Sequence, residues 1–188
     1  MNTIRSFVAV PLSAELISQI EKIQDQLKKL TTDVKWVNPS SVHLTLKFLG
    51  NIEVTQIEKI AQGIQNGIKG ISKWIAEVKD IGAFPSLKNP RVIWVGIEDE
   101  RNQLVNLQKR IENEMEKLGF KREERKFSPH LTLGRARSSK GKSELVKYLL
   151  QAQEPFSVEI NIDQVVLFKS DLRPTGAVYT RLKEFPLI

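Results

Sequence analysis

The chain of 188 residues contains only two histidines, and both begin the same tetrapeptide. His43 opens "HLTL" at 43–46, and His130 opens a second copy at 130–133. Histidine has the side chain whose ordinary pKa lies closest to neutrality, so one imidazole can be neutral while another is protonated. A neutral imidazole can accept a proton from water, and a protonated one can donate a proton to a leaving oxygen. The repeated tetrapeptide therefore supplies both groups that acid–base catalysis needs.

The first copy predicts a two-sided strand, because side chains alternate between the faces of a strand. His43 and Thr45 are expected to share one face, with Lys47 next on it. The other face is expected to be apolar and to carry the two leucines of the motif and Phe48. A threonine hydroxyl beside an imidazole can donate a hydrogen bond to a phosphoryl oxygen.

The second copy predicts the same arrangement, with His130 and Thr132 on one face. Arg135 stands at an odd spacing from them, so a twist, a bulge or the end of the strand must bring it to that face. A guanidinium there would offset the charge that builds on a phosphate. Two imidazoles, two hydroxyls and a cation around one site are the equipment for in-line displacement at phosphorus without a metal.

Three other interpretations of these residues remain open. Each histidine could be an ordinary sheet residue, with the repeat a coincidence. Two histidines could also bind zinc, although a catalytic zinc site needs a third protein ligand and no His-Glu-x-x-His pattern is present. The stretch "ARSSKGKS" at 136–143 matches the tail of an ATP-binding phosphate loop, but alanine replaces its first glycine and no parallel α/β pattern surrounds it. We expect a basic loop there.

The charge of the chain favours a phosphate-bearing partner. The net charge is +7, and residues 121–147 hold nine Lys or Arg against three Glu, which is nearly the whole surplus. Such a block attracts phosphates and speeds encounter with nucleic acid. A solvated loop face is the alternative explanation, but this block surrounds the second copy of the motif.

The remaining composition predicts a cytoplasmic protein. There is no cysteine, which excludes disulfides and thiolate metal sites and fits a reducing compartment. The apolar run near the N-terminus is short and interrupted by Arg5 and Pro11, so it does not predict a signal peptide. No stretch has the length and apolarity of a membrane-spanning helix.

Helical and strand-like segments alternate along the chain. Apolar residues recur with helical spacing in 16–30, 57–68, 104–118 and 145–150. Strand-like runs rich in β-branched and aromatic residues lie at 6–12, 34–39, 43–49, 74–84, 91–97, 130–136, 156–162, 164–170 and 177–185. Strands outnumber helices by about two to one, which favours an α+β fold with antiparallel sheets.

The ordered set of motifs resembles a known family. "VKWVNPSSVHLTLKFLG" and "FSPHLTLGRAR" are similar to the two motifs of the RNA 2′,3′-cyclic phosphodiesterases, also called 2′-5′ RNA ligases, within the two-histidine (2H) phosphoesterase superfamily. The opening, middle and closing segments of that family are resembled, in order, by "RSFVAVPL", "IGAFPSLKNPRVIWVGI" and "VVLFKSDLRPTGAVYTRLKEFPL". The resemblance extends over essentially the whole chain.

This resemblance implies a fold. Residues 1–188 would form one bilobal α+β domain, with two pseudo-symmetric lobes of antiparallel sheet flanked by helices around a central cleft. Each lobe would supply one motif, 43–46 or 130–133, to the active site in that cleft.

The resemblance also implies an activity and roles. The protein would hydrolyse an RNA 2′,3′-cyclic phosphate to a 2′-phosphate with no metal and no other cofactor. His43 would donate a proton to the departing 3′ oxygen, and His130 would be the base that activates water. Thr45 and Thr132 would hold the phosphate, and Arg135 would contact it.

Further expectations follow from the same resemblance. Phe7, Phe48 and Trp36 could contact a base, with core packing as the alternative for each. The partners would be RNA ends with a cyclic phosphate, such as transfer-RNA fragments, or cyclic nucleotides, and we expect a monomer. The family can also run the reverse 2′-5′ ligation. The competing hypothesis is a non-catalytic module that binds RNA ends or nucleotides.

Overall fold

The computed structural model describes residues 2–30, 33–138, 142–151, 157–174 and 176–188. Its helices occupy the four segments whose apolar spacing predicts them, and the first begins at a serine cap, where the Ser13 hydroxyl accepts from the Leu16 amide at 3.2 Å. The helices are α1 (Ala14–Lys28), α2 (Ile57–Ile68), α3 (Gln103–Lys117) and α4 (Lys142–Gln151). None of the helices in these ranges is long and apolar enough to cross a membrane.

All the predicted strand-like runs form strands, and every pairing between them is antiparallel. Short 3₁₀ turns, η1 (Pro39–Ser41) and η2 (Val54–Gln56), flank the strand of the first motif. The strands are β1 (Thr3–Val10), β2 (Val34–Trp36), β3 (Leu44–Glu53), β4 (Trp74–Ser86), β5 (Asn89–Glu98), β6 (His130–Ala136), β7 (Ser157–Ile162), β8 (Gln164–Arg173) and β9 (Gly176–Pro186).

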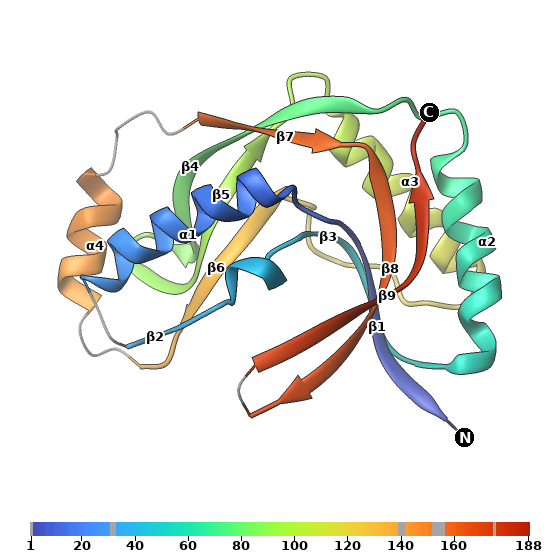
Figure 1. The fold of residues 1–188 in the computed structure, drawn as a ribbon, viewed down its shortest axis with the longest axis horizontal. Coiled ribbons are helices and arrows are strands. Elements are labelled where there is room, and N and C mark those ends of the chain that lie inside the picture. Colours follow the sequence, from blue (N-terminus) through green and yellow to red (C-terminus); the bar gives the residue numbers. More distant parts are fainter. Residues whose placement is uncertain (1, 31–32, 139–141, 152–156, 175) are drawn as a thin grey trace.

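The described strands form one curled sheet with internal symmetry. Its order is β7-β4-β5-β6-β3-β1-β8-β9, and β2 pairs separately with β6. From the centre outward, β3-β1-β8-β9 form one lobe and β6-β5-β4-β7 form the other. The pseudo-symmetric, antiparallel α+β fold that the sequence predicts is therefore confirmed. The lobes share one continuous sheet, however, and the two motif strands are direct neighbours at its centre (Figure 1).

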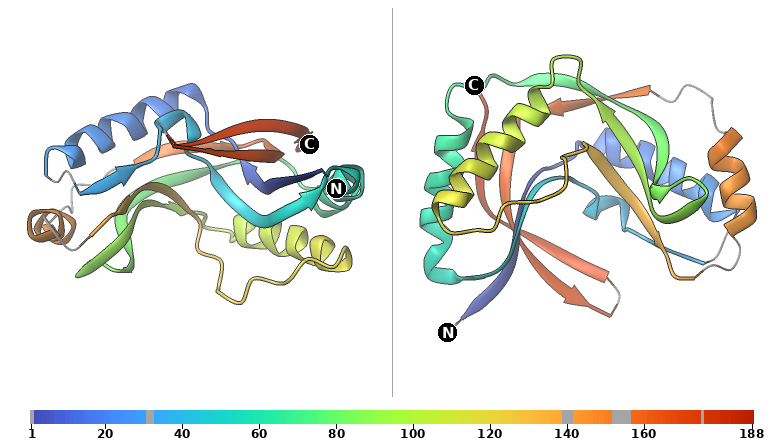
Figure 2. Two further views of the ribbon diagram at one scale, coloured as in Figure 1. Left: turned by 90° about the horizontal axis from the view of Figure 1, so that it is seen from below. Right: turned by 180° about the vertical axis from the view of Figure 1, so that it is seen from behind.

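Two helices accompany each lobe. Figure 1 shows α1 and α4 with the β4–β7 lobe, and α2 and α3 with the β1, β3, β8 and β9 lobe. Seen from below, α1 and α3 lie on opposite sides of the molecule (Figure 2). Helices α2 and α3 pack against each other across Gly63 and Gly67, where an added Cβ would approach Met115 Cε to 2.8 Å and Ile111 Cδ1 to 2.9 Å. Glycine at these positions permits the close contact.

The two faces of the sheet bury different clusters. The main core packs the sheet against the helices and includes Val8, Val10 and the leucines of both HLTL copies. A small second cluster lies on the opposite face and consists of Phe7, Ala9, Val166 and Phe168, with Tyr179 packed against it. Alternation along β1 separates the two clusters, since its even positions enter the main core and its odd positions enter the second. The second cluster lies beside the histidines.

Candidate active site

The register of the two central strands brings the HLTL copies together. Leu44 of β3 pairs with Leu131 of β6 in antiparallel orientation. This register places His43 across from Thr132, and Thr45 across from His130. Residues opposite one another in a sheet point to the same face, so all four polar side chains face the same way and the two imidazoles are diagonal neighbours.

Each imidazole is held by a carbonyl two residues before it. Nδ1 of His43 lies 2.8 Å from the Ser41 carbonyl oxygen, and Nδ1 of His130 lies 2.7 Å from the Ser128 carbonyl oxygen. A carbonyl only accepts, so each Nδ1 carries a proton and donates it. Each Nε2 is then the atom left to exchange a proton with a ligand. The two halves of the site thus repeat not only a motif but also its hydrogen bond.

Aromatic rings fix the plane of each imidazole. The His43 ring stacks on Phe7, with centroids 4.5 Å apart and planes at 25°, and it meets the edge of Tyr179 at 5.1 Å. His130 makes an edge contact with Phe84 at 5.0 Å. These contacts limit rotation of each ring, which keeps its Nε2 directed to the shared face.

Burial keeps both imidazoles neutral in the unliganded protein. It lowers the pKa of His43 to about 4, against the opposing effect of the Ser41 hydrogen bond. Burial also lowers the pKa of His130, helped by the nearby Arg135 guanidinium and opposed by the Ser128 hydrogen bond. A bound phosphate anion acts in the other direction because it favours the charged form. Such a ligand would therefore favour protonation of one of the two rings.

The prediction for Lys47 and Phe48 is wrong, because β3 has a bulge within the motif. Ala9 of β1 pairs with Thr45, but Val8 pairs with Lys47, which leaves Leu46 as the extra residue. Beyond that point the faces exchange. Lys47 enters the main core side, and Phe48 emerges on the histidine side, where its ring lies 6.2 Å from Phe7.

A matching bulge brings Arg135 to the histidine face. On β5, Trp94 pairs with Thr132 and Ile93 pairs with Gly134, so Leu133 is the extra residue. Ile93 is fully buried in the main core, and the next position, Arg135, turns to the opposite side. Of the three possibilities that the sequence leaves open for Arg135, a twist, a bulge or the strand end, the structure shows a bulge. The two bulges fall at the same leucine of each HLTL copy.

Lys47 instead forms a buried network that holds the basic loop after α3. Its Nζ lies 2.5 Å from Glu112 Oε1 and donates to the Lys121 carbonyl at 2.6 Å, and the side chains of the ion pair are both about 5% exposed. Glu112 Oε1 also accepts from the Glu123 amide at 3.0 Å. The loop continues to Ser128, whose carbonyl holds His130. One strand of the site thereby anchors the segment that leads into the other.

The three aromatic side chains that sequence suggests as base contacts lie in different surroundings. Phe7 is buried beneath His43 at 3% exposure, whereas Phe48 is 62% exposed. Trp36 packs against the main core and covers Gly134, where an added Cβ would approach its Cε3 to 2.9 Å. The structure therefore brings Phe48 alone of the three to an open position on the histidine face.

Two side chains of the site are not predicted by the sequence. Tyr179 and Phe84 both contact an imidazole edge-on, from β9 and β4 respectively. Strand-like alternation in "AVYTRL" and "DIGAF" indicates that these rings lie on strands, but nothing local indicates which strands lie near the motifs. Long-range pairing decides their positions.

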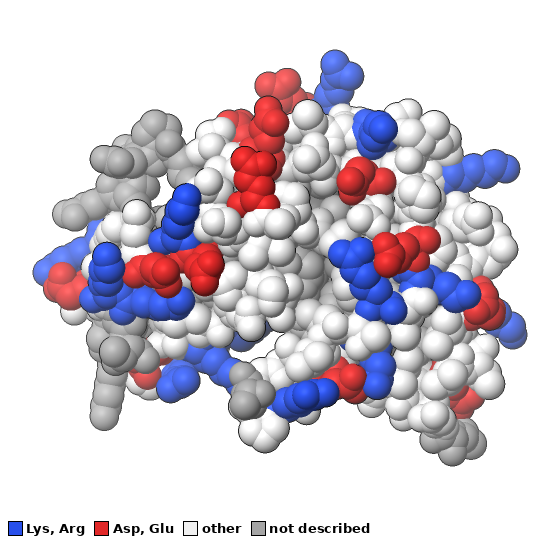
Figure 3. Space-filling model, in the orientation of Figure 1, with Lys and Arg blue, Asp and Glu red and all other residues white. Residues whose placement is uncertain are grey.

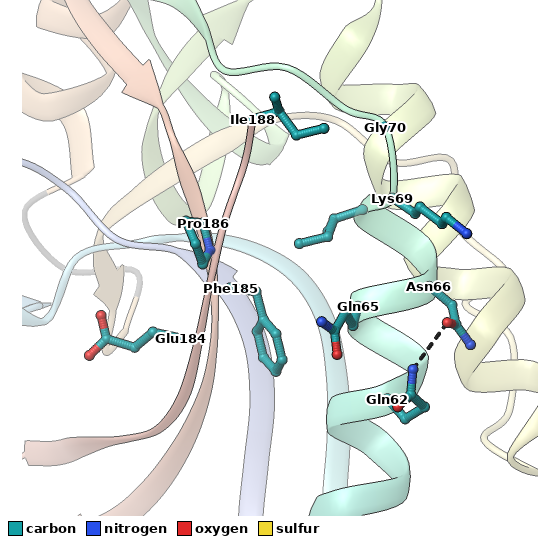
Figure 4. A pocket seen from close by; sticks show the side chains of 10 residues that line it. Gln62, Gln65, Asn66, Lys69, Gly70, Glu184, Phe185, Pro186 and Ile188 are labelled. Carbon is teal, nitrogen blue, oxygen red and sulfur yellow. Dashed lines mark hydrogen bonds between the residues drawn. The ribbon is translucent and has the colours of Figure 1, made fainter.

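Other candidate sites lie elsewhere or offer no ligand set. A surface cavity of about 500 Å³ lies between α2 and the end of β9, with Gln62, Gln65 and Phe185 in its wall and neither histidine (Figure 4). Among the described residues, no group of three or more His, Cys, Asp or Glu is placed to hold a metal ion. Residues 139–141 of the "ARSSKGKS" stretch lie outside the described residues, and α4 begins at 142.

Comparison with known proteins identifies the family. The sequence profile of the 2′-5′ RNA ligase superfamily matches residues 6–174, a span that includes both HLTL copies. The chain belongs to this superfamily.

Alignments of this 2′-5′ RNA ligase superfamily member with curated relatives extend over nearly its whole length. It is 32% identical to the "RNA 2′,3′-cyclic phosphodiesterase" of Methanothermobacter thermautotrophicus, over 98% of this chain and 99% of the relative. It is 33% identical to the protein of the same name from Thermotoga maritima, over 96% and 94%.

Structural similarity agrees. The crystal structure of TT0787 of Thermus thermophilus matches with a TM-score of 0.81 and 25% identity, and covers 98% of each chain. The family, the fold and an enzyme of the phosphodiesterase class, as the sequence predicts, are thus confirmed.

Proposed function

We propose that this enzyme hydrolyses the 2′,3′-cyclic phosphate at an RNA end to a 2′-phosphomonoester, with His43 and His130 as its acid and base. The relatives named RNA 2′,3′-cyclic phosphodiesterase support this substrate. The observation that carries the mechanism is the pair of histidines on adjacent antiparallel strands. Each is fixed through Nδ1 by a carbonyl, so each Nε2 is left to exchange protons on one shared face.

In the proposed step, water attacks phosphorus as the bond from phosphorus to the 3′ oxygen breaks. His130 Nε2 takes the proton that the water loses, and protonated His43 Nε2 gives its proton to the 3′ oxygen. After the step, His130 has gained one proton and His43 has lost one, so the total number of protons on the enzyme is unchanged. The donor is charged when substrate is bound because the substrate phosphate raises the pKa of the nearby imidazole.

The hydroxyls and the arginine complete the phosphate site. Thr45 lies opposite His130, and Thr132 lies opposite His43, so a phosphate between the imidazoles meets one hydroxyl from each strand. Arg135 reaches the same face through the bulge at Leu133 and stabilises the charge that builds on the phosphate oxygens.

We also propose a ligation, in which a 5′-hydroxyl takes the place of water and opens a cyclic phosphate to form a 2′-5′ bond. Here the 5′-hydroxyl loses its proton to the base and the 3′ oxygen gains one from the acid. The strained ring supplies the driving force, so no nucleotide cofactor is needed.

Product analysis tests this function. An RNA oligonucleotide ending in a 2′,3′-cyclic phosphate is incubated with the enzyme and excess EDTA, and the product is identified by chromatography against 2′- and 3′-phosphate standards. The expected product is the 2′-phosphate, at a rate that the chelator leaves unchanged. A 3′-phosphate, or a rate that requires an added divalent ion, would contradict the proposal. Binding without turnover would favour the non-catalytic module instead.

The roles of the two histidines need a separate test, because the motifs are symmetric. In a phosphodiester with an aryl leaving group, the aryl oxide departs readily without protonation. Hydrolysis of that substrate therefore needs a base but no acid. We expect His43→Ala to be nearly as active as the wild type on that substrate, and His130→Ala to be strongly impaired. The opposite result would exchange the two roles.

A further inference from the structure

Arg5 is a cation beside the site that has no carboxylate partner among the described residues. It is exposed, and it lies two residues before Phe7 on β1, which pairs regularly with β8 at Ser6 and Phe7. Arg5 and Phe7 therefore share the histidine face of the strand. Arg135, on the same face, likewise forms no ion pair within the described ranges.

Neighbouring cations of the same lobe behave differently. Lys169 pairs with Asp171 at 3.0 Å, and Arg181 pairs with Glu184 at 3.0 Å. Lys183 pairs with a glutamate of α2 at 2.8 Å. Since these three cations are already neutralised by carboxylates and Arg5 is not, the guanidinium at position 5 is available to an external anion.

Tyr179 connects Arg5 to the catalytic face. Its ring meets the edge of His43 at 5.1 Å and the edge of Phe7 at 4.9 Å. Burial raises the pKa of its phenol, while the Arg135 and Arg5 guanidinium groups both act to lower it. Strand register agrees, because it puts Arg5 across from Ser170, the β8 residue that pairs with Tyr179, so the phenol lies in the same row as Arg5. The phenol hydroxyl is a hydrogen-bond donor with no protein acceptor among the described residues.

Phe48 provides an open ring next to these groups. It pairs with Phe7 across β1 and β3, on the histidine face, and is 62% exposed. Arg5 pairs with Asn51, three residues further along β3. An exposed aromatic ring beside a cation is the combination with which proteins hold single-stranded RNA, because the ring stacks on a base while the cation contacts the backbone.

We propose that Arg5 and the Tyr179 hydroxyl form a second phosphate subsite, which holds the backbone phosphate preceding the cyclic end, with a base stacked on Phe48. The preferred substrate is then an oligonucleotide end and not a cyclic mononucleotide. This inference rests on the proposed function, because the first phosphate must lie at the histidines.

The test compares two substrates that share one reacting group. They are uridine 2′,3′-cyclic phosphate and a trinucleotide ending in the same cyclic uridine, and kcat/KM is measured for each. We expect the wild type to favour the trinucleotide. Arg5→Ala should lower the trinucleotide-to-mononucleotide ratio about tenfold, the loss typical of one charge-assisted contact. Tyr179→Phe, which keeps the ring, should lower the ratio about threefold.

Arg181→Ala is the matched control, because it removes an exposed arginine from the same lobe that already has a carboxylate partner. It should leave the ratio within twofold of the wild-type value. A wild-type ratio near one, or an unchanged ratio in Arg5→Ala, would overturn the second subsite while the proposed function stands. If the wild type hydrolyses neither substrate, the proposed function fails and the subsite fails with it.

Discussion

At the scale of single residues, the two imidazoles have the same anchor but different surroundings. Both are partly buried, but His43 stacks on Phe7, whereas His130 lies near the Arg135 guanidinium. Both environments disfavour the charged ring, since burial removes its solvation and a neighbouring cation repels it. In the proposed mechanism, both imidazoles are therefore neutral before substrate binds, and the substrate phosphate favours protonation of the one that acts as the acid.

The effect of bound phosphate on the imidazole pKa values predicts that the pH profiles of kcat/KM and of kcat have different optima. The proposed mechanism requires one charged and one neutral imidazole, so each profile should be bell-shaped between two apparent pKa values of the pair. Both pKa values are lowered below 6.5 in the free enzyme, so the optimum of kcat/KM should lie below pH 6.5. The bound phosphate raises them, so the optimum of kcat should lie at higher pH. Coincident optima would contradict the effect assigned to the phosphate.

Sequence predicts that the histidines and threonines of the two motifs lie together, because the motif is repeated, and the register of the central strands places all four on one face. It fails at Lys47 and Phe48, since strict alternation assumes a strand without bulges. It also omits Tyr179, which reaches His43 only because β9 folds back along β8. The errors fall where tertiary structure, not local spacing, fixes the direction of a side chain.

At the scale of elements, a buried ion pair ties the strand of the first motif to the loop that leads to the second. Glu112 lies on α3, between Lys47 of β3 and the amide of Glu123. Its other oxygen accepts from Gln108 at 3.0 Å. A buried carboxylate with several donors is costly to leave without its cation.

Lys47→Met should therefore lower the free energy of unfolding by about 3–5 kcal/mol, as measured by urea denaturation. Glu112→Gln alone should also destabilise, because it leaves the ammonium buried without its counter-charge. The double variant should lose less free energy of unfolding than the sum of the two single losses. The difference should exceed about 1 kcal/mol, because the partners interact directly. Strictly additive losses would show that Lys47 and Glu112 are not coupled.

Sequence patterns predict the number and type of these elements because helices and strands here have clear periodicity. They do not predict that β4 crosses to the lobe of β6, or that β8 returns to pair with β1. Both pairings join segments far apart in the chain, and no local pattern specifies such contacts.

At the scale of the whole molecule, several of the cations behind the net charge of +7 are neutralised by carboxylate partners. On the face seen in Figure 3, basic and acidic groups are interspersed around a mostly uncharged middle. Even in the basic block after α3, Lys121 pairs with Glu124 and Arg122 pairs with Glu116. If the proposed function is right, the unpaired cations beside the histidines should attract RNA more specifically than the net charge does.

Salt dependence should reflect those contacts. Release of counterions gives a slope of roughly −0.7 in log affinity against log salt for each phosphate contact with a single strand. The plot of log kcat/KM for a trinucleotide should therefore be steeper, by roughly that amount, than the plot for a cyclic mononucleotide. Equal slopes would indicate that the second phosphate makes no contact.

The most direct test of the two-histidine mechanism is the single-turnover rate of His43→Ala and of His130→Ala on saturating RNA with a 2′,3′-cyclic phosphate end. The cleavage rate of each variant should be about 10²–10⁴-fold below wild type, the usual contribution of a general acid or base. Substrate affinity should change only a few-fold, because the threonines and Arg135 remain. A variant that keeps a rate within threefold of wild type would contradict the paired acid–base mechanism.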